Sequence, residues 1–356
     1  MATILYREMV RMDDDTRLAL EAFVARSAGE PALALRLAAR PLQGGLSAGA
    51  ALISARYRDA LGKNRRLAFV VKRLEGSAAR EVSAYRQIAA AHAPRSSPAL
   101  LGADPVGGDR WHLYLERIRP AHPWPWRDTA HARRVLERLA ELHAAAPIPS
   151  LAGALDAWDY DAELGGAAQG TLQLAERFNA QLPRADRPAA LPRSLPALRR
   201  LVSTLPALRR ALLDFPLLGR AVIHGDVHPG NVMVRLRRRR HEPVLLDWGR
   251  ARIGSPLEDV SSWLQSLGYW EPEARRRHDS LLTAYLVARG LPGVLTRDLR
   301  DAYWLAAASN VLSGALAYQL AVAGDPAMPA DTRAAALRAA LDWLRVLRRA
   351  DACWRA

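Results

Sequence analysis

Cysteine is almost missing from this chain of 356 residues, because Cys353, close to the end of the sequence, is the only one. Since a disulfide needs two cysteines, an internal disulfide framework is excluded. A chain without disulfides depends on a buried core for its stability, and half of these residues are apolar. Such sparing use of cysteine is typical of a reducing compartment, and we expect a cytoplasmic protein.

Long hydrophobic runs are also missing. The first thirty residues include Arg7, Glu8, Arg11 and Asp13, and they contain no continuous apolar segment of the kind that begins a secretion signal. No later stretch is continuously apolar and uncharged over the roughly 18 residues that a bilayer-crossing helix needs. We therefore expect no standard export signal, no membrane-spanning helix and no membrane partner.

Lysine is scarce in a chain with a formal net charge of +15, since only two of its 51 basic residues are lysine. Such an excess of arginine suggests nucleic-acid binding. The densest basic run, Arg235-Leu236-Arg237-Arg238-Arg239-Arg240, lies between two apolar segments, where the tip of a hairpin belongs. It contains no aromatic residue on which a base could stack. We interpret the run as a solvated hairpin end and expect no nucleic-acid partner; contact with an anionic surface is the alternative.

The most informative motif is His224-Gly225-Asp226-Val227-His228-Pro229-Gly230-Asn231, which is followed 21 residues after Asp226 by Asp247-Trp248-Gly249. Apolar segments flank both motifs, and short strands there would bring Asp226, Asn231 and Asp247 together. Phosphoryl transfer needs a carboxylate that orients the acceptor and oxygen ligands for Mg²⁺. The pattern predicts a phosphoryl-transfer site; a polar turn without a ligand is the alternative.

These residues resemble the aminoglycoside phosphotransferase and choline kinase superfamily, whose members share the fold of protein kinases. The resemblance implies that Asp226 is the catalytic base and that Asn231 and Asp247 hold Mg²⁺. It also implies that His224 and His228 shape the catalytic loop.

Three further positions bear on this resemblance. Asp259 is similar to an aspartate that braces the catalytic loop in the family, and we interpret it as a structural carboxylate near a helix start. Gly225 stands where protein kinases carry an arginine, so regulation through that arginine is not expected. Gly249 replaces a second acidic residue found in many relatives, and any metal contact from there is lost.

A kinase fold also requires an upstream lysine on a strand, held by a glutamate on the following helix. The segment Leu67-Ala68-Phe69-Val70-Val71-Lys72 has the pattern of a buried strand, and Glu81 follows at the start of an amphipathic helix near 78–91. A chain that uses arginine almost everywhere has a lysine at this place, where the two residues are not interchangeable. The alternatives are a strand-end lysine and an exposed helix-surface carboxylate.

Two other segments complete the expected nucleotide site. Gly44, Gly45 and Ser47 precede a strand predicted over 50–57, and glycines there let backbone amides approach phosphate oxygens. The alternative is a glycine-rich hairpin that binds no ligand, which would show the same pattern. Residues 111–118 alternate as a strand does. By resemblance, the backbone from Glu116 to Ile118 is the hinge that bonds the nucleotide base.

The predicted fold is α+β, with the two lobes of a protein kinase: a small antiparallel-sheet N-lobe and a larger, mainly helical C-lobe. We expect an N-terminal helical extension over 1–40, with a helix from Asp13 to Ala28, the nucleotide-binding N-lobe over 41–118 and the helical C-lobe over 119–356. A capped helix is expected after Asp128 or Thr129. Later helices are predicted over 257–267, 273–288, 297–323 and 331–350. The segment 150–219, rich in proline, gives no clear pattern.

The predicted activity is that of an ATP- and Mg²⁺-dependent kinase, with GTP as the other nucleotide, acting on a hydroxyl of a small metabolite or antibiotic. Acidic residues after Asp247 that could line a pocket for a polycationic aminoglycoside are few: Glu258, Asp259, Glu271, Glu273 and Asp279. We therefore favour a sugar, amino alcohol or similar acceptor. The alternatives are a Ser/Thr-type protein kinase and a nucleotide-binding regulatory protein with a basic nucleic-acid-contacting surface. No oligomeric state is predicted.

Overall fold

The computed structural model describes residues 14–29, 32–42, 49–145, 158–183, 185 and 187–355. The chain forms two compact units, and each takes two stretches of sequence. Unit 1 comprises Met1–Pro123 and Gly230–Ala251, and unit 2 comprises Trp124–Pro229 and Arg252–Ala356. The domain boundaries predicted from the sequence stay a prediction.

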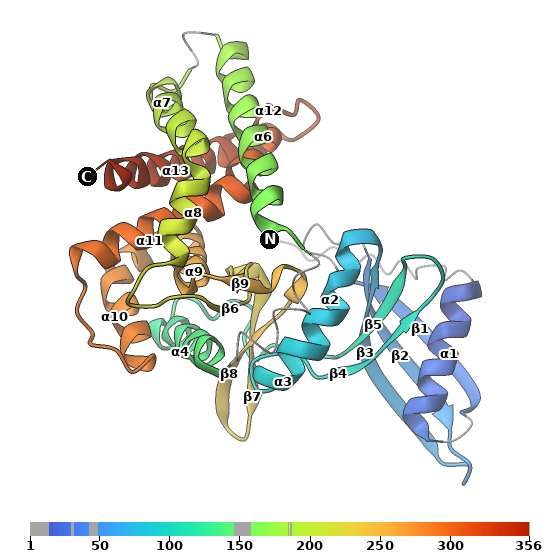
Figure 1. Cartoon of the computed structure of the whole chain (residues 1–356). Coiled ribbons are helices and arrows are strands. Elements are labelled where there is room, and N and C mark those ends of the chain that lie inside the picture. The colour runs from blue at the N-terminus through green and yellow to red at the C-terminus, as the bar shows by residue number, and fades with distance from the viewer. Residues whose placement is uncertain are drawn as a thin grey trace. The chain divides into compact units, whose positions relative to one another are not determined.

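Unit 1 is built on a five-stranded antiparallel sheet of order β1-β2-β3-β5-β4 (Figure 1). Its strands are β1 (Leu33–Pro41), β2 (Ala50–Arg58), β3 (Asn64–Leu74), β4 (Leu100–Pro105) and β5 (Trp111–Glu116). The helical elements are α1 (Asp14–Ala28), η1 (Gly76–Ala79), α2 (Arg80–Ala84), the π-helical turn η2 (Tyr85–Ala89) and α3 (Ala90–His92). The predicted antiparallel sheet is confirmed.

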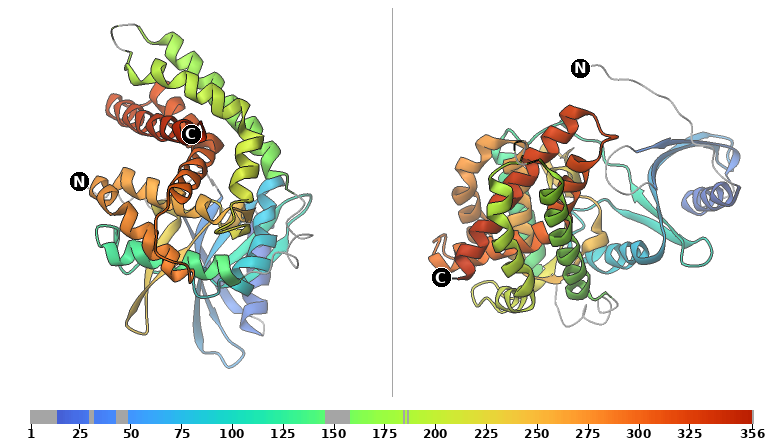
Figure 2. Two further views of the ribbon diagram at one scale, coloured as in Figure 1. Left: turned by 60° about the vertical axis from the view of Figure 1, so that its left-hand side comes forward. Right: turned by 90° about the horizontal axis from the view of Figure 1, so that it is seen from above.

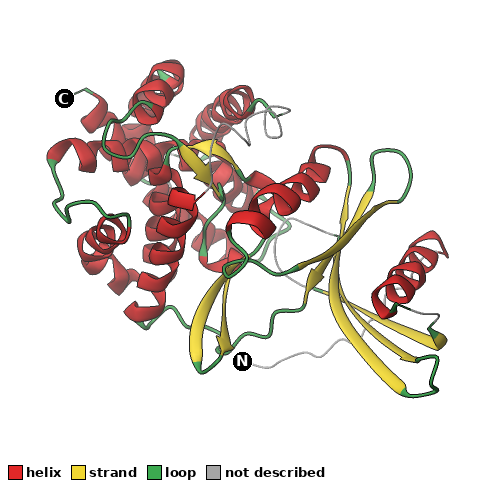
Figure 3. Ribbon diagram, turned by 60° about the horizontal axis from the view of Figure 1, so that its bottom comes forward, coloured by secondary structure: helices red, strands yellow, loops and turns green. Residues whose placement is uncertain are grey.

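The helix α1 covers one face of this sheet (Figure 3). Alternate strand residues such as Ile53, Phe69 and Tyr114 point to that face and pack against Leu20 and Phe23 of α1. Phe23 stacks on Tyr114 with ring centroids 3.9 Å apart. These contacts bury the face of the sheet that α1 covers. Strand residues at the intervening positions point to the opposite face.

The strand β1 corrects one expectation, because it lies within the segment 1–40 that we predicted to be a helical extension. Leucine recurs at every second position, Leu33, Leu35 and Leu37, which is the period of a strand rather than of a helix. Pairing with β2 makes β1 the edge strand of the sheet. The predicted helix before it is confirmed as α1.

A separate hairpin of unit 1 contains β7 (Val232–Arg237) and β8 (Arg240–Leu245), followed by the short helix η4 (Trp248–Arg250). Its two-residue turn consists of Arg238 and Arg239, whose φ angles are +46° and +63°. Positive φ at both central residues is the geometry of the tight turns that suit the twist of paired strands. The predicted position of the basic run at a hairpin tip is confirmed.

Unit 2 is mainly helical, as Figure 2 shows. Its helices are α4 (Thr129–Ala145), α6 (Tyr160–Gln181), α7 (Ala190–Ser203), α8 (Leu205–Leu213), α9 (Pro256–Trp270), η5 (Pro272–Arg277), α10 (His278–Ala288), α11 (Arg297–Asn310), the π-helical turn η6 (Val311–Ala315), α12 (Leu316–Gly324) and α13 (Ala330–Trp354). The strands β6 (Ala221–Ile223) and β9 (Arg252–Gly254) pair antiparallel, and the short helix η3 (Pro229–Asn231) lies where the chain passes between the units. The four later helical segments predicted from the sequence are confirmed.

One helical stretch of unit 2 has the length and composition of a membrane span. It runs from Arg297 to Gly324 over 28 residues, and half of its most apolar window is buried within the protein. Gly314 interrupts it with a φ of +144°, and its two parts pack against α13. Core helices share these properties, so the stretch assigns no contact with a membrane.

Candidate functional site

Unit 1 contains a buried ion pair between the sheet and the following helix. The Nζ atom of Lys72, on β3, donates to Oε1 of Glu81, on α2, at 2.7 Å. Lys72 faces away from the α1 side of the sheet because its strand neighbours Phe69 and Val71 point to that side. Burial alone would lower the pKa of Lys72, but the negative charges of Glu81 and Asp247 outweigh it and raise that pKa. Lys72 is therefore a fixed cation.

The second carboxylate beside Lys72 belongs to Asp247, which follows β8. Its Oδ1 atom lies 3.2 Å from Lys72 Nζ, and its side chain is 37% exposed, compared with 3% for Glu81. Asp247 has a left-handed backbone with a φ of +60°, which aspartate adopts more readily than most residues. The exposed carboxylate can reach a ligand without breaking the pair between Lys72 and Glu81.

The β7–β8 hairpin places Asn231 beside Asp247. Val232 pairs with Leu245 at the open end of the hairpin, and the backbone N–H of Leu246 donates to the carbonyl of Asn231 at 2.8 Å. An amide oxygen and a carboxylate at one end of a hairpin are the hard donors that Mg²⁺ prefers. These two residues therefore fit a divalent metal ion.

The helix α2 also holds the segment that follows Asp247. The Nε atom of Arg80 donates to the carbonyl of Gly249 at 2.6 Å, and the backbone N–H of Trp248 donates to Glu81. We did not single out Arg80, although its position next to Glu81 on a predicted helix is the signal that could have found it. Glu81 thus links the strand lysine to the backbone after Asp247.

Some of the other residues predicted to bind the nucleotide are outside the described residues, and one is bonded within the protein. Gly44, Gly45 and Ser47 lie outside the described residues. The N–H of Glu116 donates to the carbonyl of Ala99 at 2.9 Å, and its carboxylate pairs with Arg235 at 3.2 Å. Among the described residues, none forms a backbone hydrogen bond with Ile118. Of the proposed hinge, Glu116 is engaged within the protein.

Unit 2 carries Asp226 in the loop that follows β6. The side chain of Asp226 is 39% exposed, and its backbone N–H donates to Nδ1 of His224 at 3.3 Å. Nε2 of His228 lies 3.9 Å from Oδ1 of Asp226. Gly225 has a φ of +82°, a conformation that glycine adopts without strain. The loop thus presents a solvated carboxylate on a tightly turned backbone.

Asp259, in the first turn of α9, holds this loop from inside the protein. It is fully buried and accepts the backbone N–H groups of His224 and Gly225, both at 2.7 Å. Nε2 of His143 lies 3.1 Å from it, and Nδ1 of His143 lies 2.8 Å from the hydroxyl of Tyr285. Burial would raise the pKa of Asp259, but these bonds and charges together lower it. Asp259 is therefore an ionised anchor of the loop.

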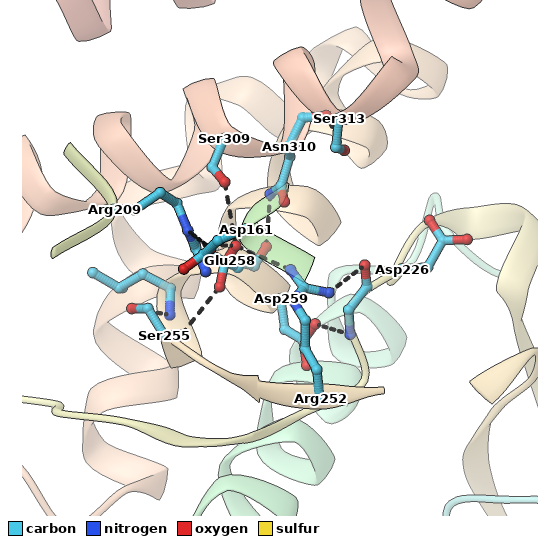
Figure 4. Close-up of polar contacts among 12 residues, drawn as sticks. Asp161, Arg209, Asp226, Arg252, Ser255, Glu258, Asp259, Ser309, Asn310 and Ser313 are labelled. Carbon is cyan, nitrogen blue, oxygen red and sulfur yellow. Dashed lines mark hydrogen bonds and ion pairs between the residues drawn. The ribbon is translucent and has the colours of Figure 1, made fainter. Parts of the chain in front are cut away.

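A second buried group lies beside Asp259 (Figure 4). Glu258, the next residue on α9, accepts from Arg252 at 3.0 Å and from Arg209 at 2.7 Å. Our interpretation of the sequence assigned no role to Arg209 or Arg252, and it considered Glu258 only as a residue that could line an acceptor pocket. The signal that could have found Glu258 is its place three residues after Ser255, since the two form a capping box at the start of α9.

Residues 40–294 match the model of the "Phosphotransferase enzyme family". A search of curated proteins finds no match.

Solved structures show the same fold at low sequence identity. Ethanolamine kinase of Plasmodium vivax aligns with a TM-score of 0.56 and 10% identity over 97% of this chain and 93% of its own. An aminoglycoside phosphotransferase from Alicyclobacillus acidocaldarius aligns with a TM-score of 0.52 and 16% identity over 89% and 92%. The complex of APH(2")-IIia with GDP and kanamycin aligns with a TM-score of 0.53 and 15% identity over 94% of this chain and 99% of its own. The predicted kinase-like fold is confirmed.

Proposed function

The chain belongs to the phosphotransferase enzyme family, and from this premise we propose that it is an ATP- and Mg²⁺-dependent kinase that phosphorylates a hydroxyl group of a small molecule. The observation that carries the proposal is the contact of Lys72 with both Glu81 and Asp247. A scaffold protein needs no buried lysine held between two carboxylates. A nucleotide-binding enzyme uses such a lysine to bind phosphate oxygens.

In this proposal the residues of unit 1 bind the nucleotide. Lys72 contacts the α- and β-phosphates while Glu81 keeps it in place. Asn231 and Asp247 hold Mg²⁺, which supplies positive charge for the phosphate oxygens when it is bound. The backbone of Ile118 bonds the base, and GTP is the alternative to ATP.

Asp226 would act on the acceptor. Its carboxylate accepts the proton of the acceptor hydroxyl as the oxygen forms its bond to the γ-phosphorus and the bond from that phosphorus to the leaving nucleoside diphosphate breaks. The two N–H bonds to Asp259 support the loop before Asp226. His224 and His228 would complete that support.

The charges of unit 2 bear on the class of acceptor. Each of the five acidic candidates is engaged: Glu258 and Asp259 are fully buried, Glu271 accepts from Trp124 at 2.6 Å, Glu273 pairs with Arg276 at 3.1 Å and Asp279 pairs with Arg300 at 2.9 Å. A polycation needs unpaired carboxylates in its site. We therefore propose a neutral or singly charged acceptor, such as a sugar or an amino alcohol, in a cytoplasmic enzyme that does not bind nucleic acid.

The test is turnover of ATP and GTP by the purified full chain with Mg²⁺ against a panel of sugars, amino alcohols and aminoglycosides. We expect phosphorylation of a sugar or amino alcohol and little turnover with aminoglycosides. Preferred phosphorylation of a generic protein substrate would overturn the small-molecule proposal in favour of a protein kinase. No turnover together with salt-sensitive retention on nucleic acid would favour the regulatory alternative.

A further inference from the structure

Glu258, Arg252 and Arg209 form a buried charged group, and this group contacts Gly225, the residue before Asp226. Arg252, on β9, is 4% exposed and has Ile223 of β6 as its strand partner. Its Nη1 atom donates to the carbonyl of Gly225 at 3.4 Å, while its Nη2 atom donates to Glu258 at 3.0 Å. Figure 4 shows Arg252 between Glu258 and the loop of Asp226. One guanidinium thus connects the first turn of α9 to the loop.

Gly225 is consequently fixed at both of its backbone polar groups. Asp259 accepts its N–H at 2.7 Å, and Arg252 donates to its carbonyl. That carbonyl belongs to the peptide plane shared with Asp226, so its direction sets the direction in which the Asp226 backbone continues. Since Gly225 has no side chain and a φ of +82°, its own conformational preference does not select this orientation.

We propose that Arg252 is a positioning residue for Asp226, and that Glu258 and Tyr160 hold Arg252 in place for this purpose. The proposal rests on the function proposed above, because it concerns the same loop. Arg252 need not touch the acceptor or the nucleotide. It acts through the Gly225 carbonyl, which it keeps aligned while Asp259 keeps the N–H aligned.

The shape of the group explains why an arginine is needed. The Cζ atom of Arg252 lies over the Tyr160 ring, 3.6 Å from its centre, and the Nη2 and Nη1 atoms make the hydrogen bonds to Glu258 and Gly225. A planar fork can stack and bond in two directions at once, whereas a lysine ammonium is a point charge. A lysine at this position would lose the stacking and one of the two bonds.

The charges of the group are balanced, so Arg252 can remain buried and ionised. Arg209 donates to Glu258 at 2.7 Å and to Asp161 at 2.9 Å, and Ser309 also donates to Glu258 at 3.3 Å. Two arginines therefore face two carboxylates. Burial would raise the pKa of Glu258, but the two arginines lower it and keep the carboxylate charged.

The first test measures turnover in Arg252→Met and Arg252→Lys. Loss of loop alignment should lower kcat by about 10- to 100-fold in Arg252→Met, with the nucleotide KM within about twofold of wild type. Arg252→Lys should lie closer to Arg252→Met than to wild type. Tyr160→Leu, which keeps the ion pair and removes the ring, should show a smaller loss in the same direction and covers the case in which Arg252→Met does not fold.

The matched control is Arg200→Met. Arg200, on α7, pairs with the buried Asp351 of α13 at 2.7 Å, so its loss also breaks a salt bridge of unit 2. We expect Arg200→Met to keep wild-type kcat after correction for the folded fraction. An equal loss of kcat in this control, or wild-type kcat in Arg252→Met, overturns the positioning role.

A second measurement does not depend on turnover and separates this proposal from the proposed function. Amide hydrogen exchange of the segment 221–228 should accelerate in Arg252→Met and remain at the wild-type rate in Arg200→Met. Segment 244–249 of unit 1 should exchange at the wild-type rate in both variants. Faster exchange in 221–228 supports the positioning role even if the acceptor panel fails; unchanged exchange there overturns it.

Discussion

Two charged networks, one in each unit, hold the candidate functional residues, and they differ in how completely the protein satisfies them. In unit 1 the carboxylate of Asp247 is 37% exposed beside Lys72. In unit 2 the carboxylate of Asp259 is fully buried and accepts two backbone N–H groups besides its contact with His143. The first network has a carboxylate that a ligand can reach, whereas the carboxylate of Asp259 in the second is buried and bonded to protein atoms.

The difference follows from what each network must do. A group that binds phosphate or metal must be reachable from water and must exchange water for a ligand. A group that fixes a backbone loop is most effective when water cannot compete for its hydrogen bonds. Asp247 fits the first description, and Asp259, Glu258 and Arg252 fit the second.

Substituting one carboxylate in each network should show the largest difference in stability between the two networks. Asp259→Asn should lower the free energy of unfolding by about 3–5 kcal/mol, because it removes a buried charge to which several donors are bonded. Asp247→Asn should lower it by less than about 1 kcal/mol, because Asp247 is partly solvated and asparagine tolerates its left-handed backbone. Urea unfolding followed by tryptophan fluorescence measures both. Equal losses would show that burial does not separate the networks.

Glu258 and Asp259 of unit 2 and Lys72 of unit 1 should lose their stabilising contributions at opposite ends of the pH range. The pKa values of Glu258 and Asp259 are lowered in the folded protein from ordinary values of 4.5 and 3.8, so their contribution is present above those values and is lost as pH falls through the folded pKa. The pKa of Lys72 is raised from 10.5, so its contribution is present below that value and is lost as pH rises through the folded pKa.

Urea midpoints measured from acid to alkaline pH test this assignment. Glu258→Gln should flatten the acid limb of the profile, and Lys72→Met should flatten the alkaline limb. A wild-type acid limb in Glu258→Gln would contradict the proposed charge state of the unit 2 network.

Two glycines, one beside each network, differ in the space that surrounds them. A Cβ on Gly254 would lie 2.5 Å from Ile223 and 2.7 Å from Glu258, so Gly254→Ala should cost about 1–3 kcal/mol of unfolding free energy. A Cβ on Gly249 would meet Asp247 at 3.5 Å, an ordinary contact, and Gly249→Ala should change that free energy by less than about 0.5 kcal/mol. Thermal unfolding distinguishes them, and the reverse order would contradict the packing described for the two networks.

The amino-acid sequence predicted the parts of the molecule that depend on local pattern. The strand with Lys72, the helix with Glu81 and the hairpin around Arg238 follow from periodicity and turn position within single segments. The strand β1 was missed because the segment before residue 41 was assigned from its helical beginning. The helices α7 and α8 were not predicted, because prolines, including Pro196 inside α7, obscure the helical pattern. The helix α6 contains no proline, but glycines such as Gly165 and Gly166 weaken its helical pattern.

The support of the catalytic loop could not be predicted, because its partners come from separate elements. Arg252 contacts Gly225 of the loop, Glu258 of α9 and Tyr160 of α6, and no spacing rule joins these positions. The resemblance to a family did indicate a bracing role for Asp259, but it did not indicate that His143 contacts the same carboxylate. Long-range hydrogen bonds of this kind become visible only in the folded chain.

We propose that residues of unit 1 bind the nucleotide and that Asp226 of unit 2 accepts the proton. The most direct measurement is nucleotide affinity by calorimetry together with kcat, in Asp226→Asn and in Lys72→Met. Asp226→Asn should lower kcat by about 10²- to 10⁴-fold and leave nucleotide affinity unchanged, whereas Lys72→Met should weaken nucleotide binding. Unchanged turnover in Asp226→Asn, or a parallel loss of nucleotide binding in that variant, would contradict the account.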